Sequence, residues 1–164
     1  MGKPAARVAD NVVHPIPPAL APGPGSVTVL IGGKPAWRGV MAAVAAGLQA
    51  AKQVSDTTIQ VAETATLAAA GTPGAPAAKA AEETTKAAAA ATMGSTISSA
   101  AGMADKHMCG TPLPIPPHGV GVVINGSPTV LINNLPACRM GDTLLEAVGP
   151  PNKIVSGDFT VSIG

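Results

Sequence analysis

The sequence predicts a mainly β fold with pseudo-threefold symmetry, made of three repeats of about 31 residues, into which an α-helical hairpin is inserted. Two recurring motifs and one change of composition predict this fold. The strand-like segments GSVTVLIG, GSPTVLIN and GDFTVSIG begin at Gly25, Gly126 and Gly157. The signature Pro-Ala-x-Arg begins at Pro4, Pro35 and Pro136. Between residues 39 and 104 lie 24 of the chain's 32 alanines, which indicates a separate helical segment.

The spacing of the motifs defines the insertion. From Pro4 to Pro35 is 31 positions, as it is from Gly126 to Gly157, but the middle unit holds 70 extra residues. We therefore expect the β part to comprise residues 1–38 and 105–164, and the insertion to comprise residues 39–104. No single unit could bury its apolar strand alone, so three units must share one narrow core.

The insertion is expected to form two helices. Segments 39–70 and 77–103 are rich in helix formers, and the Gly and Pro residues of GTPGAP at 71–76 separate them. Apolar residues available for a seam are Val40, Val44, Leu48, Val54, Ile59, Val61 and Leu67. Trp37 is expected to pack the root of the hairpin against the β part. The hairpin is either a solvated projection or a docking arm, and the sequence favours neither.

Charge and hydropathy exclude several classes of protein. A net charge of +1 with 12% charged residues gives no basic stripe for nucleic acid or for an anionic membrane surface. The N-terminus has no apolar run after Lys3 and Arg7, so we expect a chain made in the cytoplasm without a signal peptide. The Ala-rich stretches are less apolar than the ~20 residues of a membrane span.

The loops that follow the signatures carry candidate metal ligands at equivalent positions. Ten residues after the signature proline stand His14 in the first unit and Glu146 in the third. The aspartates at the sixth position are Asp10 and Asp142, and Asp105 is aligned with them in the interrupted unit. This alignment puts Cys109 at the tenth position of the second unit.

The predicted zinc ligands are His14, His107, Cys109 and His118. His107 lies two residues before Cys109, on the same side of an extended strand, and His118 follows a proline-rich turn. Three imidazoles and one thiolate complete a tetrahedral Zn²⁺ site with no position open for water, so we expect one structural zinc ion. Glu146 is an alternative ligand. Cys138 replaces an Ala of the signature and is expected to be a small buried residue.

These motifs resemble the PAAR-repeat proteins. The family's Pro-Ala-Ala-Arg stands at residues 4–7, and GSPTVLIN at 126–133 followed by LPACRMGD at 135–142 is also typical of it. The segment AARVADNVVH at 5–14 resembles the family's short pre-PAAR motif, in which His14 would be a zinc ligand.

The resemblance implies a pointed β-cone that caps the trimeric spike of a contractile injection machine, such as a type VI secretion system, a phage tail or an extracellular particle. Zinc would stiffen the apex, and one chain would sit on a trimeric valine-glycine-repeat type spike protein. The candidate spike contacts are Val29, Ile31, Val130, Ile132, Val161 and Ile163. Such a protein is not an enzyme; it would be carried out of the cell or into target cells and would meet a membrane only by piercing it.

Departures from the family pattern leave alternatives open. Proteins with the pre-PAAR motif often carry transmembrane helices, for which this insertion is too polar, and no toxin domain is expected after Gly164. The insertion could instead hold an effector or a chaperone, which would make the chain a zinc-binding adaptor. An enzyme would use Cys109 as nucleophile with His107 or His118 as base, but no oxyanion motif accompanies them. The segments PIPP at 15–18 and 114–117 could also act as a proline-rich docking ligand.

Overall fold

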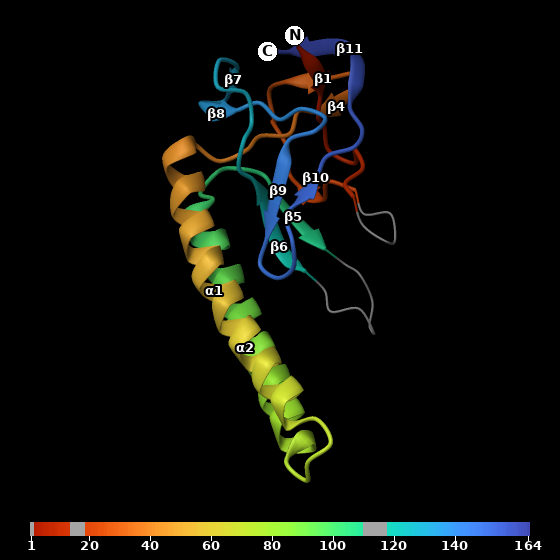
Figure 1. Cartoon of the computed structure of the whole chain (residues 1–164). Helices are drawn as coiled ribbons and strands as arrows, with labels where there is room; N and C mark the ends of the chain where they lie inside the picture. The colour runs from red at the N-terminus through yellow and green to blue at the C-terminus, as the bar shows by residue number, and fades with distance from the viewer. Residues whose placement is uncertain (1, 14–18, 110–117) are drawn as a thin grey trace.

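A computed structural model describes residues 2–13, 19–109 and 118–164 of the chain. The predicted ligand His14 and both PIPP segments lie outside these residues. In Figure 1 the strands gather at one end of the molecule, and a pair of long helices projects from them. The described residues thus form a mixed α/β protein whose strands pair antiparallel, with a helical hairpin inserted as predicted.

The hairpin consists of α1 (Ala42–Ala69) and α2 (Ala75–Ala100). Gly71 ends the first helix in the left-handed region, with φ of 76°, where a residue without a side chain is least strained. The hydroxyl of Thr72 donates to the carbonyl of Ala69 and accepts from the N–H of Gly74, which bridges the turn. A proline in the first turn of α2 suits the helix start, because no intrahelical acceptor is available there.

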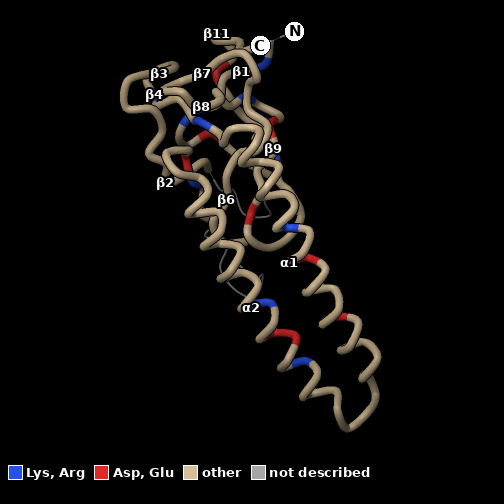
Figure 2. Tube along the Cα trace, turned by 90° about the vertical axis from the view of Figure 1, so that its left-hand side faces the viewer, with Lys and Arg blue, Asp and Glu red and all other residues tan. Residues whose placement is uncertain are grey.

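The seam between the helices uses fewer large side chains than the sequence predicts. Leu48 and Ile59 are buried in it, but Val54, Val61 and Leu67 are 65–75% exposed. The buried residues of α1 are spaced three, four and seven positions apart and so share one face of the helix: Ala45, Leu48, Lys52 and Ile59. Val54 and Val61 stand on the opposite face. Polar pairs join the seam as well: the ammonium of Lys86 lies 2.7 Å from carboxylate oxygens of both Glu63 on α1 and Glu82 on α2. Figure 2 shows charges of both signs interspersed along the hairpin.

A five-stranded antiparallel sheet carries the candidate ligands. Its strand order is β10-β9-β6-β5-β2. The strands are β2 (Pro22–Gly23), β5 (Lys106–Cys109), β6 (Gly119–Val123), β9 (Thr143–Glu146) and β10 (Asn152–Lys153). The root of the hairpin covers this sheet: Leu48, Met93 and Ile97 pack in one cluster with Val122 and Leu145. The hairpin is therefore anchored to the β part at its root.

Three two-stranded pairs form the other end of the described β part. They are β3 (Leu30–Ile31) with β4 (Lys34–Pro35), β7 (Leu131–Ile132) with β8 (Leu135–Pro136), and β1 (Lys3–Ala5) with β11 (Asp158–Ile163). Gly32–Gly33 and Asn133–Asn134 close the first two pairs, and all four residues have positive φ, as tight hairpin turns require. The third pair joins the two ends of the chain, because β1 and β11 come from opposite ends of the sequence.

The three pairs share a small core. One cluster unites Ile31, Ile132 and Ile163 with the signature alanines Ala5, Ala36 and Ala137. Trp37 lies elsewhere, fully buried among β-part residues that include Leu20, Val123 and Leu144. That position corrects the prediction that Trp37 packs the hairpin root, since its cluster contains no residue of α1 or α2.

Neither helix in the described part of the chain combines the length and the apolar character needed to cross a membrane.

Candidate metal centre and its repeat framework

Each signature arginine forms the same frame with an aspartate. The carboxylate accepts hydrogen bonds from the Nε and Nη2 atoms of the arginine, and from the backbone N–H of the same residue at 2.8 Å. The pairs are Arg7 with Asp10, Arg38 with Asp105, and Arg139 with Asp142. Such two-pronged pairs fix the geometry of both partners. Burial raises the pKa of Asp142, although Arg139 opposes the shift.

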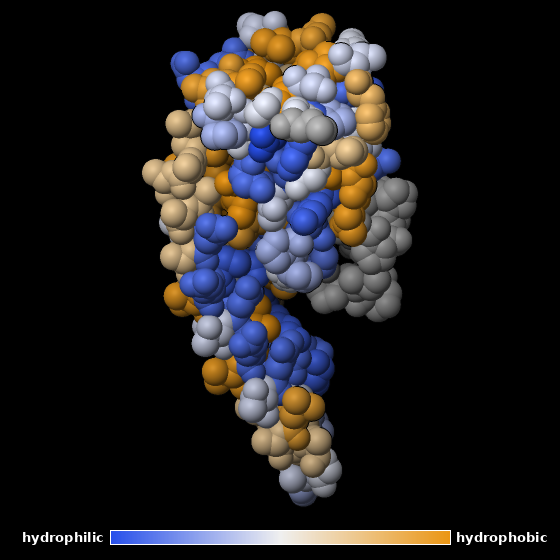
Figure 3. All heavy atoms as spheres, turned by 45° about the horizontal axis from the view of Figure 1, so that its top comes forward, coloured by the Kyte–Doolittle hydropathy of each residue, from blue (hydrophilic) through white to orange (hydrophobic). Residues whose placement is uncertain are grey.

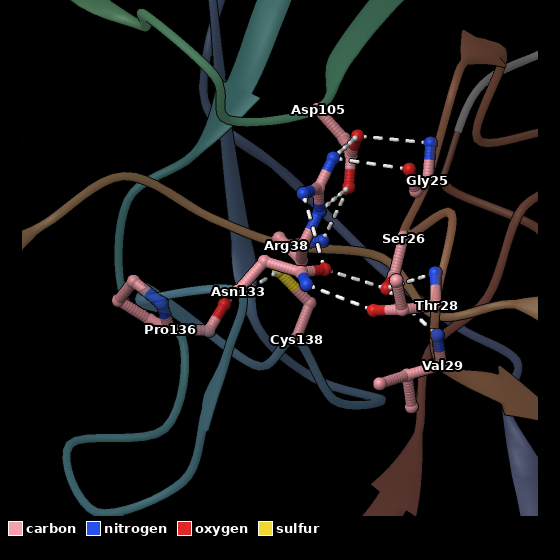
Figure 4. Close-up of polar contacts among 9 residues, drawn as sticks. All are labelled: Gly25, Ser26, Thr28, Val29, Arg38, Asp105, Asn133, Pro136 and Cys138. Carbon is pink, nitrogen blue, oxygen red and sulfur yellow. Dashed lines mark hydrogen bonds and ion pairs between the residues drawn. The ribbon is translucent and has the colours of Figure 1, made fainter.

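The Arg38–Asp105 pair confirms the alignment of the interrupted unit. In the other units the partners are three residues apart, whereas here 67 positions separate them because the hairpin lies between. Asp105 is fully buried and also accepts from the N–H of Gly25 at 2.9 Å, while Arg38 donates to the carbonyl of Gly25 at 3.0 Å (Figure 4). The pair therefore closes the repeat across the insertion.

The recurring Gly and Pro of the two motifs lie against each other. A methyl group on Gly25 would lie 2.6 Å from Cβ of Pro35, and one on Gly126 would lie 2.8 Å from Cβ of Pro136. Gly157 is packed in the same way against the backbone of Pro4 and Ala5, so a methyl group there would lie 2.8 Å from the Ala5 oxygen. The recurrence of Gly is thus explained by close packing.

Each strand pair also contacts the turn or chain end of another. The contacting residues are Ser26 with Asn133, Ser127 with Gly164, and Asp158 with Gly32. The hydroxyl of Ser26 donates to Oδ1 of Asn133 at 2.6 Å (Figure 4), and the hydroxyl of Ser127 donates to the carbonyl of Gly164. Asp158, which stands where the others have Ser, leaves no room for a side chain on Gly32. The β3–β4 pair thus contacts β7–β8, the β7–β8 pair contacts β1–β11, and the β1–β11 pair contacts β3–β4, so the three pairs form a ring.

The predicted spike contacts divide into two groups. Ile31, Ile132 and Ile163 are only 6–7% exposed and form the shared core, whereas Val130 and Val161 are each 37% exposed and Val29 is partly buried. Other apolar side chains exposed on these segments are Val27, Leu30, Leu131 and Phe159, which the sequence analysis did not single out. Figure 3 shows apolar side chains over this end of the molecule. Alternation along the short strands explains why Leu30 and Leu131 are exposed beside the buried Ile31 and Ile132. It does not separate the valines from the isoleucines, because these stand two residues apart.

A buried group of metal-ligand types lies at the opposite end of the sheet. One donor atom from each of Cys109, His118 and Glu146 lies within 4.8 Å of the other two. Cys109 ends β5, His118 directly precedes β6 and Glu146 ends β9, so antiparallel pairing brings the three together. Nδ1 of His118 is 3.0 Å from Oε2 of Glu146.

His107 lies beside this group. It is fully buried on β5, and its Nε2 is 3.4 Å from Oε1 of Glu146. Residues 107, 121 and 146 stand in register across β5, β6 and β9. Because Gly121 has no side chain, the side chains of its two neighbours meet over it; a methyl group there would lie 2.7 Å from Cγ of Glu146.

The donor set suits a metal ion. Thiolate, imidazole and carboxylate are the three side-chain ligand types of Zn²⁺, and the atoms need only small shifts to reach a common ion. Of the predicted ligands, the structure brings Cys109 and His118 into this group and sets His107 against Glu146. Repeat spacing had pointed to Glu146 only as an alternative. Cys138 is fully buried and burial raises its thiol pKa well above the usual value, as suits a small core residue.

Fold and site together define a mixed α/β protein with antiparallel strands, a candidate metal centre and a helical hairpin. The family model of the PAAR motif matches residues 114–164. This match confirms the resemblance: residues 114–164 carry a PAAR motif, which is consistent with a PAAR-repeat protein of a contractile injection system. The PAAR motif indicates a structural role at a spike tip rather than catalysis, and it implies a spike as partner. No curated protein and no solved structure matches the chain.

Proposed function

We propose that this chain caps the trimeric spike of a contractile injection machine as a pseudo-threefold β-cone. Two observations carry the proposal. The same Arg–Asp pair occurs three times. The three two-stranded pairs also contact one another in a ring, the first with the second, the second with the third and the third with the first. A single chain with this arrangement offers three similar faces to a threefold partner. A trimeric valine-glycine-repeat type spike protein would then bind one chain per trimer.

The end that carries the three strand pairs is the proposed base. Val29, Val130 and Val161 would contact the spike, and the buried isoleucines beneath them, Ile31, Ile132 and Ile163, would keep these contacts in place. The exposed Leu131 and Phe159 extend the apolar surface at this end. An exposed apolar surface of this kind is typical of a protein interface.

The opposite end is the proposed apex, closed by one structural Zn²⁺. The ligands proposed from the sequence are His14, His107, Cys109 and His118, and the closeness of Cys109 and His118 supports this location. A bound ion would add folding free energy, of order 10 kcal/mol in structural sites. The cone would act mechanically, since sheath contraction would drive it through a target membrane.

The insertion at 39–104 is proposed to carry cargo, either an effector or a chaperone. Its turn lies well beyond the ends of β5 and β9 in Figure 1, so the arm reaches past the proposed apex. At 28 residues α1 is about 42 Å long at 1.5 Å per residue. Exposed Val54, Val61 and Leu67 offer apolar contacts along it.

Catalysis is not part of the proposal. Cys109 is 3% exposed, so its sulfur is poorly placed to attack a substrate. Thiol alkylation of the folded, metal-loaded protein should be slow and should speed up after chelation. Fast alkylation before chelation would favour a Cys–His enzyme instead.

Capture by purified spike trimers tests the capping role. The parent chain should co-purify with a spike trimer, and Val161→Asp should weaken capture at least tenfold because it buries a charge in the interface. The matched control is Val61→Asp on the hairpin, another exposed valine, which should bind like the parent. Equal capture of both variants, or no capture of the folded parent, would refute the proposed base.

A further inference from the structure

We propose that Glu146 is itself a metal ligand, together with Cys109 and His118, and that His107 supports its carboxylate rather than binding the ion. This inference rests on the proposed metal-bearing apex and changes the ligand set predicted from the sequence. It replaces an imidazole by a carboxylate, so it also changes the net charge of the site.

The distances favour Glu146. Ligands of one tetrahedral zinc ion lie roughly 3.3–3.8 Å apart, given bond lengths of about 2.0–2.3 Å. The 3.0 Å between His118 Nδ1 and Glu146 Oε2 and the 3.4 Å between His107 Nε2 and Glu146 Oε1 are both close to this separation, so the position relative to the thiol decides. One donor atom each of Cys109, His118 and Glu146 lies within 4.8 Å of the other two. Among the described residues, that group does not include His107.

The surroundings of the carboxylate fit a ligand held by partners. Glu146 is 1% exposed, and its Oε2 accepts a hydrogen bond from Nδ2 of Asn152 on β10. Its other oxygen faces Nε2 of His107 at 3.4 Å. Ligating carboxylates commonly receive such hydrogen bonds, which fix their orientation. His107 and Asn152 are therefore positioning residues for Glu146.

The fold reserves space for this arrangement. Gly121 leaves the gap over which His107 and Glu146 meet, as described above. On the other side, a methyl group on Gly149 would lie 3.2 Å from ring atoms of His118, so the turn after β9 packs closely on that imidazole. Both ligand side chains are thus confined by neighbouring glycines.

The repeat supports the same assignment independently. Glu146 stands at the tenth position of its unit, as Cys109 does after Asp105 is aligned with Asp142. The Arg38–Asp105 pair confirms that alignment. His107 stands two positions earlier, so it is not repeat-equivalent to the other ligands.

Cobalt substitution of the full chain tests the assignment, because Co²⁺ takes the place of Zn²⁺ and its visible absorption reports the ligands. Glu146→Gln should lower Co²⁺ affinity at least 100-fold and change the spectrum. His107→Gln should lower affinity about 10–100-fold, the usual effect of an outer partner, with the shape of the spectrum unchanged. The matched control is Glu83→Gln on the exposed face of α2, which should change neither.

Each result of the cobalt experiment either supports the ligand assignment or overturns it. A parent-like spectrum in Glu146→Gln, or an altered spectrum in His107→Gln, would overturn the assignment. If Glu146→Gln fails to fold, Glu146→His serves instead: a new nitrogen ligand should keep binding and alter the spectrum, and an unaltered spectrum would overturn the assignment. A parent that binds no Co²⁺ would also overturn it, whereas spike capture by the same protein would still stand as a separate test of the capping role.

Discussion

The buried Arg38–Asp105 pair gives the sharpest prediction about stability. Asp105 is fully buried, and its carboxylate accepts from the backbone N–H, Nε and Nη2 of Arg38 and from the N–H of Gly25. Asp105→Ala would leave the guanidinium of Arg38, itself 5% exposed, without its counter-charge. Breaking such a pair from one side costs about 3–5 kcal/mol.

Urea unfolding followed by Trp fluorescence measures this cost. Trp37 is the chain's one tryptophan and is fully buried in the β part, so its emission reports unfolding there. The control is Glu63→Ala, which removes one of the two partners of the partly exposed Lys86 and should cost under about 1 kcal/mol. If Asp105→Ala also costs under about 1 kcal/mol, the Arg38–Asp105 pair does not stabilise the contact between the two parts of the unit that the insertion separates.

Three further predictions concern the hairpin and the metal centre. Ile97→Ala should destabilise the protein by about 2–5 kcal/mol, because Ile97 is fully buried at the hairpin root, while Val61→Ala on the exposed face should cost little by thermal unfolding. Hydrogen bonds from two lysines lower the pKa of Glu82 to about 2; its contribution is present above pH 4.5 and is lost as pH falls toward 2, so Glu82→Gln should flatten the acid dependence of helical circular dichroism. Gly121→Ala should displace Glu146 and weaken metal affinity more than tenfold by competition with a chelator, whereas unchanged affinity would remove Gly121 from the site.

The repeat and the hairpin could be predicted because they depend on local patterns. Equal motif spacing located the insertion, and the aspartate alignment placed Asp105 at the repeat-equivalent position. The pairing of Asp105 with Arg38 across 67 positions was not predicted. Helix formers bounded by Gly and Pro located α1 and α2 to within a few residues. These features need no knowledge of how distant side chains pack.

The burial of individual side chains and the register of the strands could not be predicted from the sequence. Which residues of α1 are buried depends on its tertiary contact with α2 and the sheet, and Ile59 is buried while Val54 is not. Trp37 packs with Leu20, Val123 and Leu144, which are distant from one another in the sequence. The contact between His107 and Glu146 requires the register of β5, β6 and β9, which repeat spacing alone does not give. The gap at Gly121 was the available signal, since a Gly within a strand often marks a close approach.

Native mass spectrometry of the chain mixed with a spike trimer tests the central claim most directly. A single pseudo-threefold cap should add one chain of 15.9 kDa to each trimer, even when the chain is in excess. Three added chains per trimer, or no complex with the folded chain, would contradict the account.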